Sequence, residues 1–302
     1  MSPSTPVSVR RSGTGSPSGL DGGAESSVRP EGGAGAAPRA ERQSRAPRVL
    51  FLHGLAGGGN VWDAYLERTA GADQENWIAE LPWRATESPD WTARSPAHWI
   101  RRALDQVPDG PDVVVAHSFG ANALLSLLAD PAGPPRGVRM PRAVVLVSPF
   151  YRAHAEAFDW DSISYYLNRF DAILADGLRV RSGGRLPDEL RRGMALKVRD
   201  RIGPYGWMSF FDTYLRTPQL RCDRLDVPVL IVGGGRDFAA FPRDSHALGD
   251  ALPHATVHIL PESGHFAMAE QAPEFAALTR EFIDTVVRPP AALADTPTRE
   301  HH

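Results

Sequence analysis

The chain has 302 residues, of which 42% are hydrophobic and 23% are charged, and these proportions are typical of a globular protein. Its formal net charge of −3 gives no reason to expect a nucleic acid or a membrane surface as a partner. The single cysteine, Cys222, excludes an intrachain disulfide and fits a reducing compartment, so we expect a cytoplasmic protein.

The two ends of the chain differ in composition from the rest. Residues 1–47 are rich in Ser, Gly, Pro, Ala and Arg and contain no apolar segment of the kind found in signal peptides, and residues 289–302 read similarly. Such segments bury too little apolar surface to offset the entropy of ordering them. We therefore expect a disordered leader and a disordered tail. No apolar run reaches the roughly 18 residues that a transmembrane helix needs.

Short apolar runs alternate with helical patterns between these ends. The apolar runs are nearly continuous, which is typical of strands that are covered on both faces in a parallel sheet. They occupy residues 48–52, 77–81, 112–117, 143–148, 228–234 and 256–260. Nothing before Arg48 makes a convincing strand, since residues 6–11 are a poor candidate, so we expect the sheet to be shortened at that edge.

The helical patterns lie at residues 61–70, 96–107, 120–130 and 272–287. The second of them has Ser95 as a candidate N-cap and Pro96 at the first helical position. This alternation predicts an α/β fold with a mostly parallel, doubly wound sheet. It stops after residue 150, where an aromatic-rich stretch is expected to form a mainly helical insertion over one edge of the sheet.

Ser118 lies at the turn between the strand at 112–117 and the helix at 120–130. Its surroundings, Ala116-His117-Ser118-Phe119-Gly120, match G-x-S-x-G except that alanine replaces the first glycine. In that motif the serine is a nucleophile on a sharp turn, and its small neighbours avoid clashes with the strand and helix. Serine is also a favoured helix N-cap, so these five residues alone fit either role.

A serine nucleophile needs a base to accept its proton and a third group to orient that base. Asp237 follows the strand at 228–234 and His265 follows the strand at 256–260, which is the order Ser, acid, His. Taken singly, Asp237 also fits a turn residue, and His265 fits a capping or surface histidine. Because all three occur in order at strand ends, we predict Ser118, Asp237 and His265 as the catalytic residues.

Two backbone N–H groups should stabilise the oxyanion that forms during attack by the serine. We predict those of Phe119, the residue after the serine, and of Leu55 in the glycine-rich loop at 53–62. This loop lacks the Gly-Lys-Ser/Thr ending of a P-loop, and Trp62 stands where a dinucleotide fingerprint needs a small residue. With no His-Glu-x-x-His pattern and no cysteine cluster either, we expect no cofactor and no metal.

These motifs resemble the α/β-hydrolase superfamily over residues 48–288, through the His53-Gly54 turn, Ser118, Asp237 and the Ser-Gly-His-Phe sequence at 263–266. The resemblance implies the α/β-hydrolase fold, with a core in two parts, 48–150 and 218–288, and a helical cap at 151–217. One departure is Ala116 in place of glycine. Another is the sequence after the strand at 77–81, which lacks the Asp-x-x-Gly-x-Gly common in relatives.

The expected reaction is acyl transfer to water from a small-molecule ester or thioester, through an acyl-Ser118 intermediate. The aromatic cap suggests a largely apolar acyl group, although its aromatic residues also fit simple packing of the cap onto the core. We expect the substrate pocket to include His53, Trp83, Trp160, Tyr166, Trp207 and Phe211.

Residues 179–201 are rich in basic side chains, which could attract an acyl carrier protein or a CoA thioester, or could equally form a solvated helix face. Two alternatives keep the same three catalytic residues. One is non-hydrolytic or C–C bond chemistry, such as that of a lyase, a cyclase or a lactone-forming enzyme. The other is a ligand-binding receptor, because fold alone does not determine function.

Overall fold

The computed structural model describes residues 7–12, 45–83 and 89–287. Within these residues the chain forms a seven-stranded sheet in the order β1-β3-β2-β4-β5-β6-β7, parallel except for the antiparallel edge strand β1. The predicted α/β fold with a mostly parallel sheet is confirmed. The strands are β1 (Ser8–Arg11), β2 (Arg48–Leu52), β3 (Glu75–Glu80), β4 (Val113–His117), β5 (Ala143–Val147), β6 (Val229–Gly234) and β7 (Ala255–Leu260).

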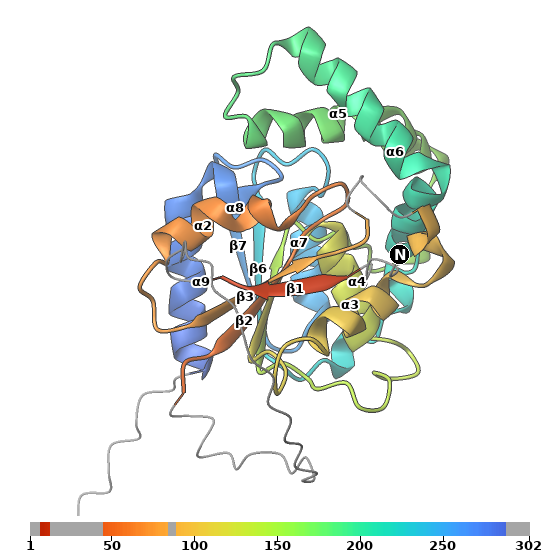
Figure 1. Cartoon of the computed structure of the whole chain (residues 1–302). Helices are drawn as coiled ribbons and strands as arrows, with labels where there is room; N and C mark the ends of the chain where they lie inside the picture. The colour runs from red at the N-terminus through yellow and green to blue at the C-terminus, as the bar shows by residue number, and fades with distance from the viewer. Residues whose placement is uncertain (1–6, 13–44, 84–88, 288–302) are drawn as a thin grey trace, which may run out of the picture.

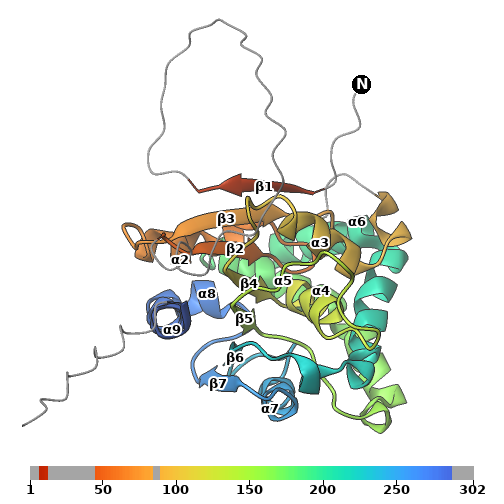
Figure 2. The same cartoon turned by 90° about the horizontal axis from the view of Figure 1, so that it is seen from below.

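Helices cover both faces of the sheet, as expected for a doubly wound fold (Figures 1 and 2). Helices α2, α8 and α9 lie on one face, and α3, α4 and α7 lie on the other. Ser95 caps α3 by accepting a hydrogen bond from the His98 N–H, as predicted. The helices are α2 (Asp63–Arg68), α3 (Pro96–Leu104), α4 (Phe119–Leu128), α5 (Trp160–Arg181), α6 (Asp188–Leu215), α7 (Pro242–Ala251), α8 (Ala267–Glu270) and α9 (Ala272–Val287).

The central strands are fully buried because each of their faces meets a helical layer. Successive side chains of a strand point to opposite faces. In β4, Val114 and Ala116 belong to the apolar cluster that includes α3 and α4, whereas Val113 and Val115 belong to the cluster that includes α9. This two-sided burial explains why the strand sequences are apolar throughout.

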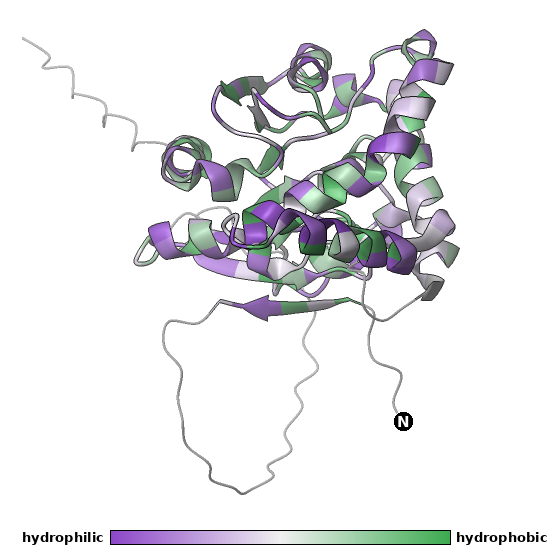
Figure 3. Ribbon diagram, turned by 90° about the horizontal axis from the view of Figure 1, so that it is seen from above, coloured by the Kyte–Doolittle hydropathy of each residue, from purple (hydrophilic) through white to green (hydrophobic). Residues whose placement is uncertain are grey.

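The edge strand β1 corrects two expectations from the sequence. Residues Ser8–Arg11 pair with β3, so the leader is not wholly without structure and the sheet is not shortened at this edge. The Gln106 side chain accepts from the Val9 N–H and donates to the Val7 carbonyl. The strand is mostly hydrophilic (Figure 3), because an edge strand can face solvent, and its sequence therefore lacks the apolar run of the inner strands. Residues 1–6, 13–44 and 288–302 lie outside the described part of the chain.

The segment between β5 and β6 is mainly helical, as predicted, and its helices α5 and α6 lie above the carboxyl ends of the strands (Figure 1). Gly203, with φ of +67°, and Pro204 interrupt α6 and divide it into two arms. The first arm packs on α5 through a small apolar cluster containing Phe170, Leu174 and Ile202. In the described ranges, none of the helices is both long and apolar enough for a membrane crossing.

Candidate active site

The chain turns sharply at Ser118, directly after β4. Its φ and ψ are +55° and −125°, a region that is costly for a residue other than glycine. A Cβ atom on Gly120 would lie 2.5 Å from the His53 carbonyl oxygen, and one on Gly54 would lie 2.9 Å from the Cβ of Ser118. The turn therefore requires glycine at both positions. Ala116, the departure from the motif, keeps regular register with Leu146 of β5.

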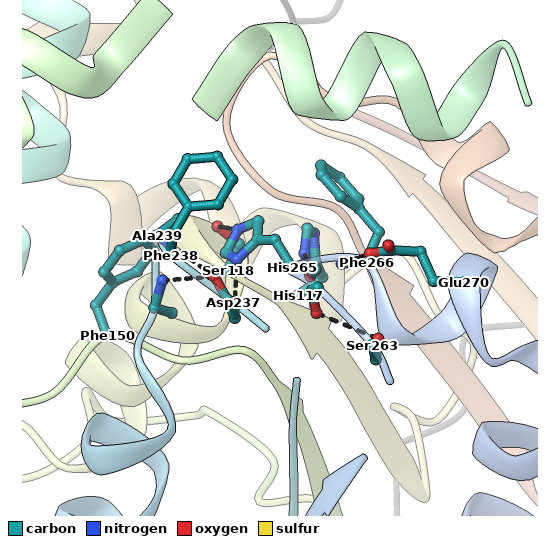
Figure 4. A network of polar contacts seen from close by, with 12 residues as sticks. His117, Ser118, Phe150, Asp237, Phe238, Ala239, Ser263, His265, Phe266 and Glu270 are labelled. Carbon is teal, nitrogen blue, oxygen red and sulfur yellow. Dashed lines mark hydrogen bonds and ion pairs between the residues drawn. The ribbon is translucent and has the colours of Figure 1, made fainter. Parts of the chain in front are cut away.

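The Ser118 side chain does not cap the following helix. It occupies the N-cap position of α4 but makes no capping hydrogen bond. Its Oγ instead lies 2.9 Å from Nε2 of His265, and Nδ1 of the same imidazole donates to Oδ2 of Asp237 over 2.8 Å. Figure 4 shows the His265 ring between the serine and the carboxylate. The structure thus brings together the three side chains that the sequence singled out as catalytic.

Two loops position the carboxylate and the imidazole. Oδ1 of Asp237 accepts from the N–H groups of Ala239 (2.8 Å) and Ala240 (3.0 Å), which fixes the carboxylate. A Cβ atom on Gly234, at the end of β6, would collide with the Gly264 carbonyl. Glycine at 234 lets the loop after β6 approach the loop after β7 closely enough for Asp237 to bind His265.

The charge state of the imidazole depends on its carboxylate partner. Burial of His265 disfavours a positive charge, but the attraction and hydrogen bond of Asp237, with smaller contributions from Asp176 and Glu270, outweigh it, so the pKa of His265 is raised. A raised pKa makes this imidazole a stronger base towards the Ser118 hydroxyl.

A second histidine, His117, holds the backbone of His265 in place. His117 is fully buried, and this burial, followed by repulsion from His265, lowers its pKa well below the ordinary value and keeps the ring neutral. Its Nε2–H donates to the His265 carbonyl over 3.0 Å, and the two ring centroids lie 4.9 Å apart. The sequence analysis missed this residue, although its position directly before Ser118 was a usable signal.

A pocket that is partly open to solvent surrounds Ser118 and His265, and its empty space, counted together with the open solvent at its mouth, is about 760 Å³. Its walls come from the loop after β2, the ends of β4 and β5, and the insertion helices. Asn122 of α4 holds Phe150 in the wall, because its amide donates to the Phe150 carbonyl and its oxygen accepts from the Phe150 N–H. The remaining lining residues are mainly apolar: Leu55, Ala56, Val61, Phe170, Ile173, Leu174, Val198, Phe210 and Phe266, with Gly54, Gly57, His117, Gly177 and Arg181.

The six residues expected to line the pocket do not line this one, and that expectation needs correction. His53 is buried, with its Nε2 accepting from the Leu81 N–H, and Trp83 packs behind the Phe119 ring. Of the four expected from the insertion, Trp160 is 83% exposed. The other three pack within the insertion or against the core: Tyr166, Trp207 and Phe211.

The two residues predicted to supply the oxyanion donors belong to the surroundings of the serine. Leu55 lines the pocket, and Phe119 directly follows Ser118 at the start of α4. Among the described residues no acceptor takes a hydrogen bond from the N–H of either Leu55 or Phe119. Phe119 is also at the positive end of the α4 dipole, which favours negative charge at this position.

Comparison with known proteins identifies the family. The model of the Alpha/beta hydrolase family matches residues 49–278, more than half of the chain, and the chain belongs to that family. The resemblance inferred from the motifs and the predicted α/β-hydrolase fold are therefore confirmed.

Two curated relatives and one solved structure illustrate the range of similar proteins. The chain is 28% identical over 81% of its length to the dihydrolipoyllysine-residue acetyltransferase component of the acetoin cleaving system of Cupriavidus necator, spanning 65% of that protein. It is 35% identical over 23% of its length to the pimeloyl-[acyl-carrier protein] methyl ester esterase of Neisseria meningitidis, spanning 22% of it. A solved structure described as Est816, an N-acyl homoserine lactone degrading enzyme, matches with a TM-score of 0.57 and 18% identity, over 79% of this chain and 93% of that one.

Proposed function

We propose that the protein is a serine hydrolase that cleaves an ester or thioester of a largely apolar acyl group through an acyl-Ser118 intermediate. The observation that carries the proposal is the continuous hydrogen-bonded sequence Ser118–His265–Asp237, buried at the base of an apolar pocket. Membership of the Alpha/beta hydrolase family and similarity to an esterase support hydrolysis in general.

In the first half of the reaction, Oγ of Ser118 attacks the carbonyl carbon while its proton passes to Nε2 of His265. The carbonyl oxygen takes the negative charge and accepts hydrogen bonds from the N–H groups of Leu55 and Phe119. The bond to the leaving oxygen or sulfur then breaks, and His265 returns the proton to this atom. Asp237 holds the imidazole in the required tautomer and stabilises its positive charge.

In the second half, water loses a proton to Nε2 of His265 and attacks the acyl carbon. The second tetrahedral intermediate collapses, Oγ of Ser118 regains the proton, and a carboxylic acid leaves. The proposed cap, residues 151–217, would cover this site. In the sequence it separates the two parts of the core, 48–150 and 218–288. It contributes Phe170, Ile173 and Leu174 to an apolar wall that would accept the acyl group.

A fluorophosphonate probe tests the nucleophile. We expect labelling of the native protein and of Ser126→Ala, and no labelling of Ser118→Ala. Ser126 is the matched control, because it lies on the same helix with its hydroxyl bonded to the Asn122 carbonyl. Labelling that persists in Ser118→Ala would exclude Ser118 as the nucleophile.

A substrate panel tests the reaction class. We expect turnover of p-nitrophenyl esters or acyl thioesters by the native protein and none by Ser118→Ala. Probe labelling without turnover of any ester or thioester would instead favour non-hydrolytic chemistry or a receptor with the same three residues.

A carrier-borne acyl thioester, on an acyl carrier protein or CoA, is the second candidate substrate. In the segment 179–201, five basic side chains form no ion pair within the described part of the chain: Arg181, Arg185, Arg192, Lys197 and Arg201. Attraction between these cations and an acidic carrier weakens as salt screens it. If the carrier is the substrate, kcat/KM for the carrier thioester falls steeply with salt, while kcat/KM for a neutral ester does not.

A further inference from the structure

The pocket wall formed by α5 changes in character at the last turn of this helix. Phe170, Ile173, Leu174 and Gly177 line the pocket, and Arg181 follows them at helical spacing. Among the described lining residues, Arg181 is the only arginine, lysine, aspartate or glutamate. A strongly apolar wall thus ends in a single cationic side chain.

No acidic side chain neutralises this cation. Within the described residues no carboxylate forms an ion pair with Arg181, whereas Arg179, on the same turn, binds both Asp176 (2.8 Å) and Glu270 (3.2 Å). Arg181 is exposed to solvent, and partial burial of its guanidinium lowers the pKa of this group. The guanidinium is therefore only partly desolvated and has no counter-charge among the described residues.

The position of Arg181 relative to the reacting atoms follows from the helix. A Cβ atom on Gly177 would lie 3.0 Å from the ring of Phe266, the residue after His265, so this part of α5 passes directly over the histidine loop. Arg181 lies four residues further, about 6 Å along the helix axis at a rise of about 1.5 Å per residue. The backbone of Arg181 therefore lies further along α5 than the histidine loop, after the apolar residues of the wall.

We propose that Arg181 binds an anionic group of the substrate, a carboxylate or a phosphate, at the end of the pocket away from Ser118. The planar guanidinium offers paired N–H donors that match the oxygens of either group. The apolar wall would accept the intervening carbon chain. This inference rests on the proposed hydrolase function for its substrate, and it deepens that function by requiring a charged end on the molecule that is cleaved.

The test compares esters that differ only in the distal charge. The native protein is assayed with p-nitrophenyl hemi-esters of dicarboxylic acids of increasing length and with neutral esters of the same lengths. We expect the hemi-ester to be preferred at a matching length. Arg181→Gln should reduce kcat/KM for that hemi-ester by about tenfold or more, equivalent to about 1.4 kcal/mol, and should change kcat/KM for the neutral ester far less.

Arg185→Gln is the control, because Arg185 is an exposed and unpaired arginine that does not line the pocket. A second arm compares acyl thioesters of pantetheine with and without the phosphate. If Arg181→Gln lowers kcat/KM only for the phosphorylated thioester, the anion is a phosphate. Equal effects of Arg181→Gln on charged and neutral substrates, or no effect on any of them, would overturn the proposal. A lowered melting temperature with unchanged selectivity would assign Arg181 a structural role at the end of the helix.

A binding measurement separates this inference from the hydrolase proposal. Calorimetry with Ser118→Ala, and with Ser118→Ala carrying Arg181→Gln, measures affinity for the hemi-ester without any turnover. Weaker binding in the double variant supports an anion site even if the native protein hydrolyses no ester. Equal binding in both variants rejects the anion site even if hydrolysis is demonstrated.

Discussion

Both ring nitrogens of His265 and its backbone carbonyl each have a separate hydrogen-bond partner. Nδ1 donates to Asp237, Nε2 faces the hydroxyl of Ser118, and the backbone carbonyl of the same residue accepts from His117. The first contact sets the basicity and tautomer of the ring, and the last fixes the loop that holds it. Because the pKa of His117 is lowered, that neighbour stays neutral and adds no repulsion when the His265 ring becomes charged.

The raised pKa of His265 predicts the pH dependence of the reaction. The imidazole accepts the serine proton only in its neutral form, so kcat/KM for a neutral ester should fall as the pH drops through the pKa of His265. The midpoint should lie above 6.5, the ordinary histidine value. Asp237→Asn removes the attraction that raises this pKa, so the midpoint should move to lower pH, and kcat should fall on the order of 10³–10⁴-fold.

The control for this pH profile is Glu262→Gln, which removes a carboxylate that is 64% exposed and paired with Arg236. This change should leave the midpoint unmoved. A profile that is the same in the native protein and in Asp237→Asn would show that the carboxylate does not control the basicity of His265.

At the scale of elements, three tyrosines join the insertion helices to the core, and the first of them, Tyr165 of α5, donates to the Phe238 carbonyl over 2.7 Å. Tyr166 of α5 donates to the Ala239 carbonyl over 2.9 Å, and Tyr214 of α6 donates to Asp244 of α7 over 3.0 Å. Burial raises the pKa of Asp244 to about 6 although Arg152 lies 2.8 Å away and opposes the shift. Ala239 belongs to the loop that binds the Asp237 carboxylate, so α5 contacts the candidate site through this loop.

Loss of the Tyr166 hydroxyl should therefore affect both stability and activity. In Tyr166→Phe the Ala239 carbonyl loses its partner in a buried position, and we expect a loss of about 1–2 kcal/mol in the free energy of unfolding. The loop that orients Asp237 should also loosen, so kcat should decrease severalfold. Urea denaturation and steady-state kinetics measure the two effects. Tyr205→Phe, at a tyrosine that is 79% exposed, should change neither quantity, and equal behaviour of the two variants would disprove this coupling.

At the scale of the whole molecule, the candidate site and the sheet edge are far apart. The site lies at the end of β4, whereas β1 forms the edge, with β3 and β2 between them. At a strand spacing of about 4.8 Å, the two are separated by about 14 Å. The edge strand should therefore contribute to stability without contributing to chemistry.

Val7, just before β1, tests this separation because its side chain is fully buried. Val7→Ala should lower the free energy of unfolding by about 2 kcal/mol, from lost apolar burial and the small cavity that remains. Labelling of Ser118 by the fluorophosphonate should be unaffected below the melting temperature. Ser8→Ala, at an exposed side chain of β1, is the matched control. A native-like melting temperature for Val7→Ala would mean that the edge strand is not required for stability.

The local sequence was sufficient for six of the seven strands and for the order of the candidate site residues. The strands β2 to β7 were predictable from their apolar runs, which are nearly continuous in the central strands because those are buried on both faces. Ser118, Asp237 and His265 were predictable as a group because each follows such a strand, and parallel strands end at one edge of the sheet. The polar strand β1 was not predictable, because its stability comes from pairing with β3 and not from an apolar pattern.

The identity of the pocket residues was decided only by tertiary structure. Composition marks the insertion as aromatic, but the rotation and packing of α5 and α6 determine which rings face Ser118. Phe170 and Phe210 line the pocket, whereas Tyr166 and Phe211 pack away from it. The same rotation directs Arg181, one of many arginines in the sequence, to the pocket. Strand ends are specified by local patterns, whereas side-chain neighbours across a helical layer depend on contacts between residues that are distant in the chain.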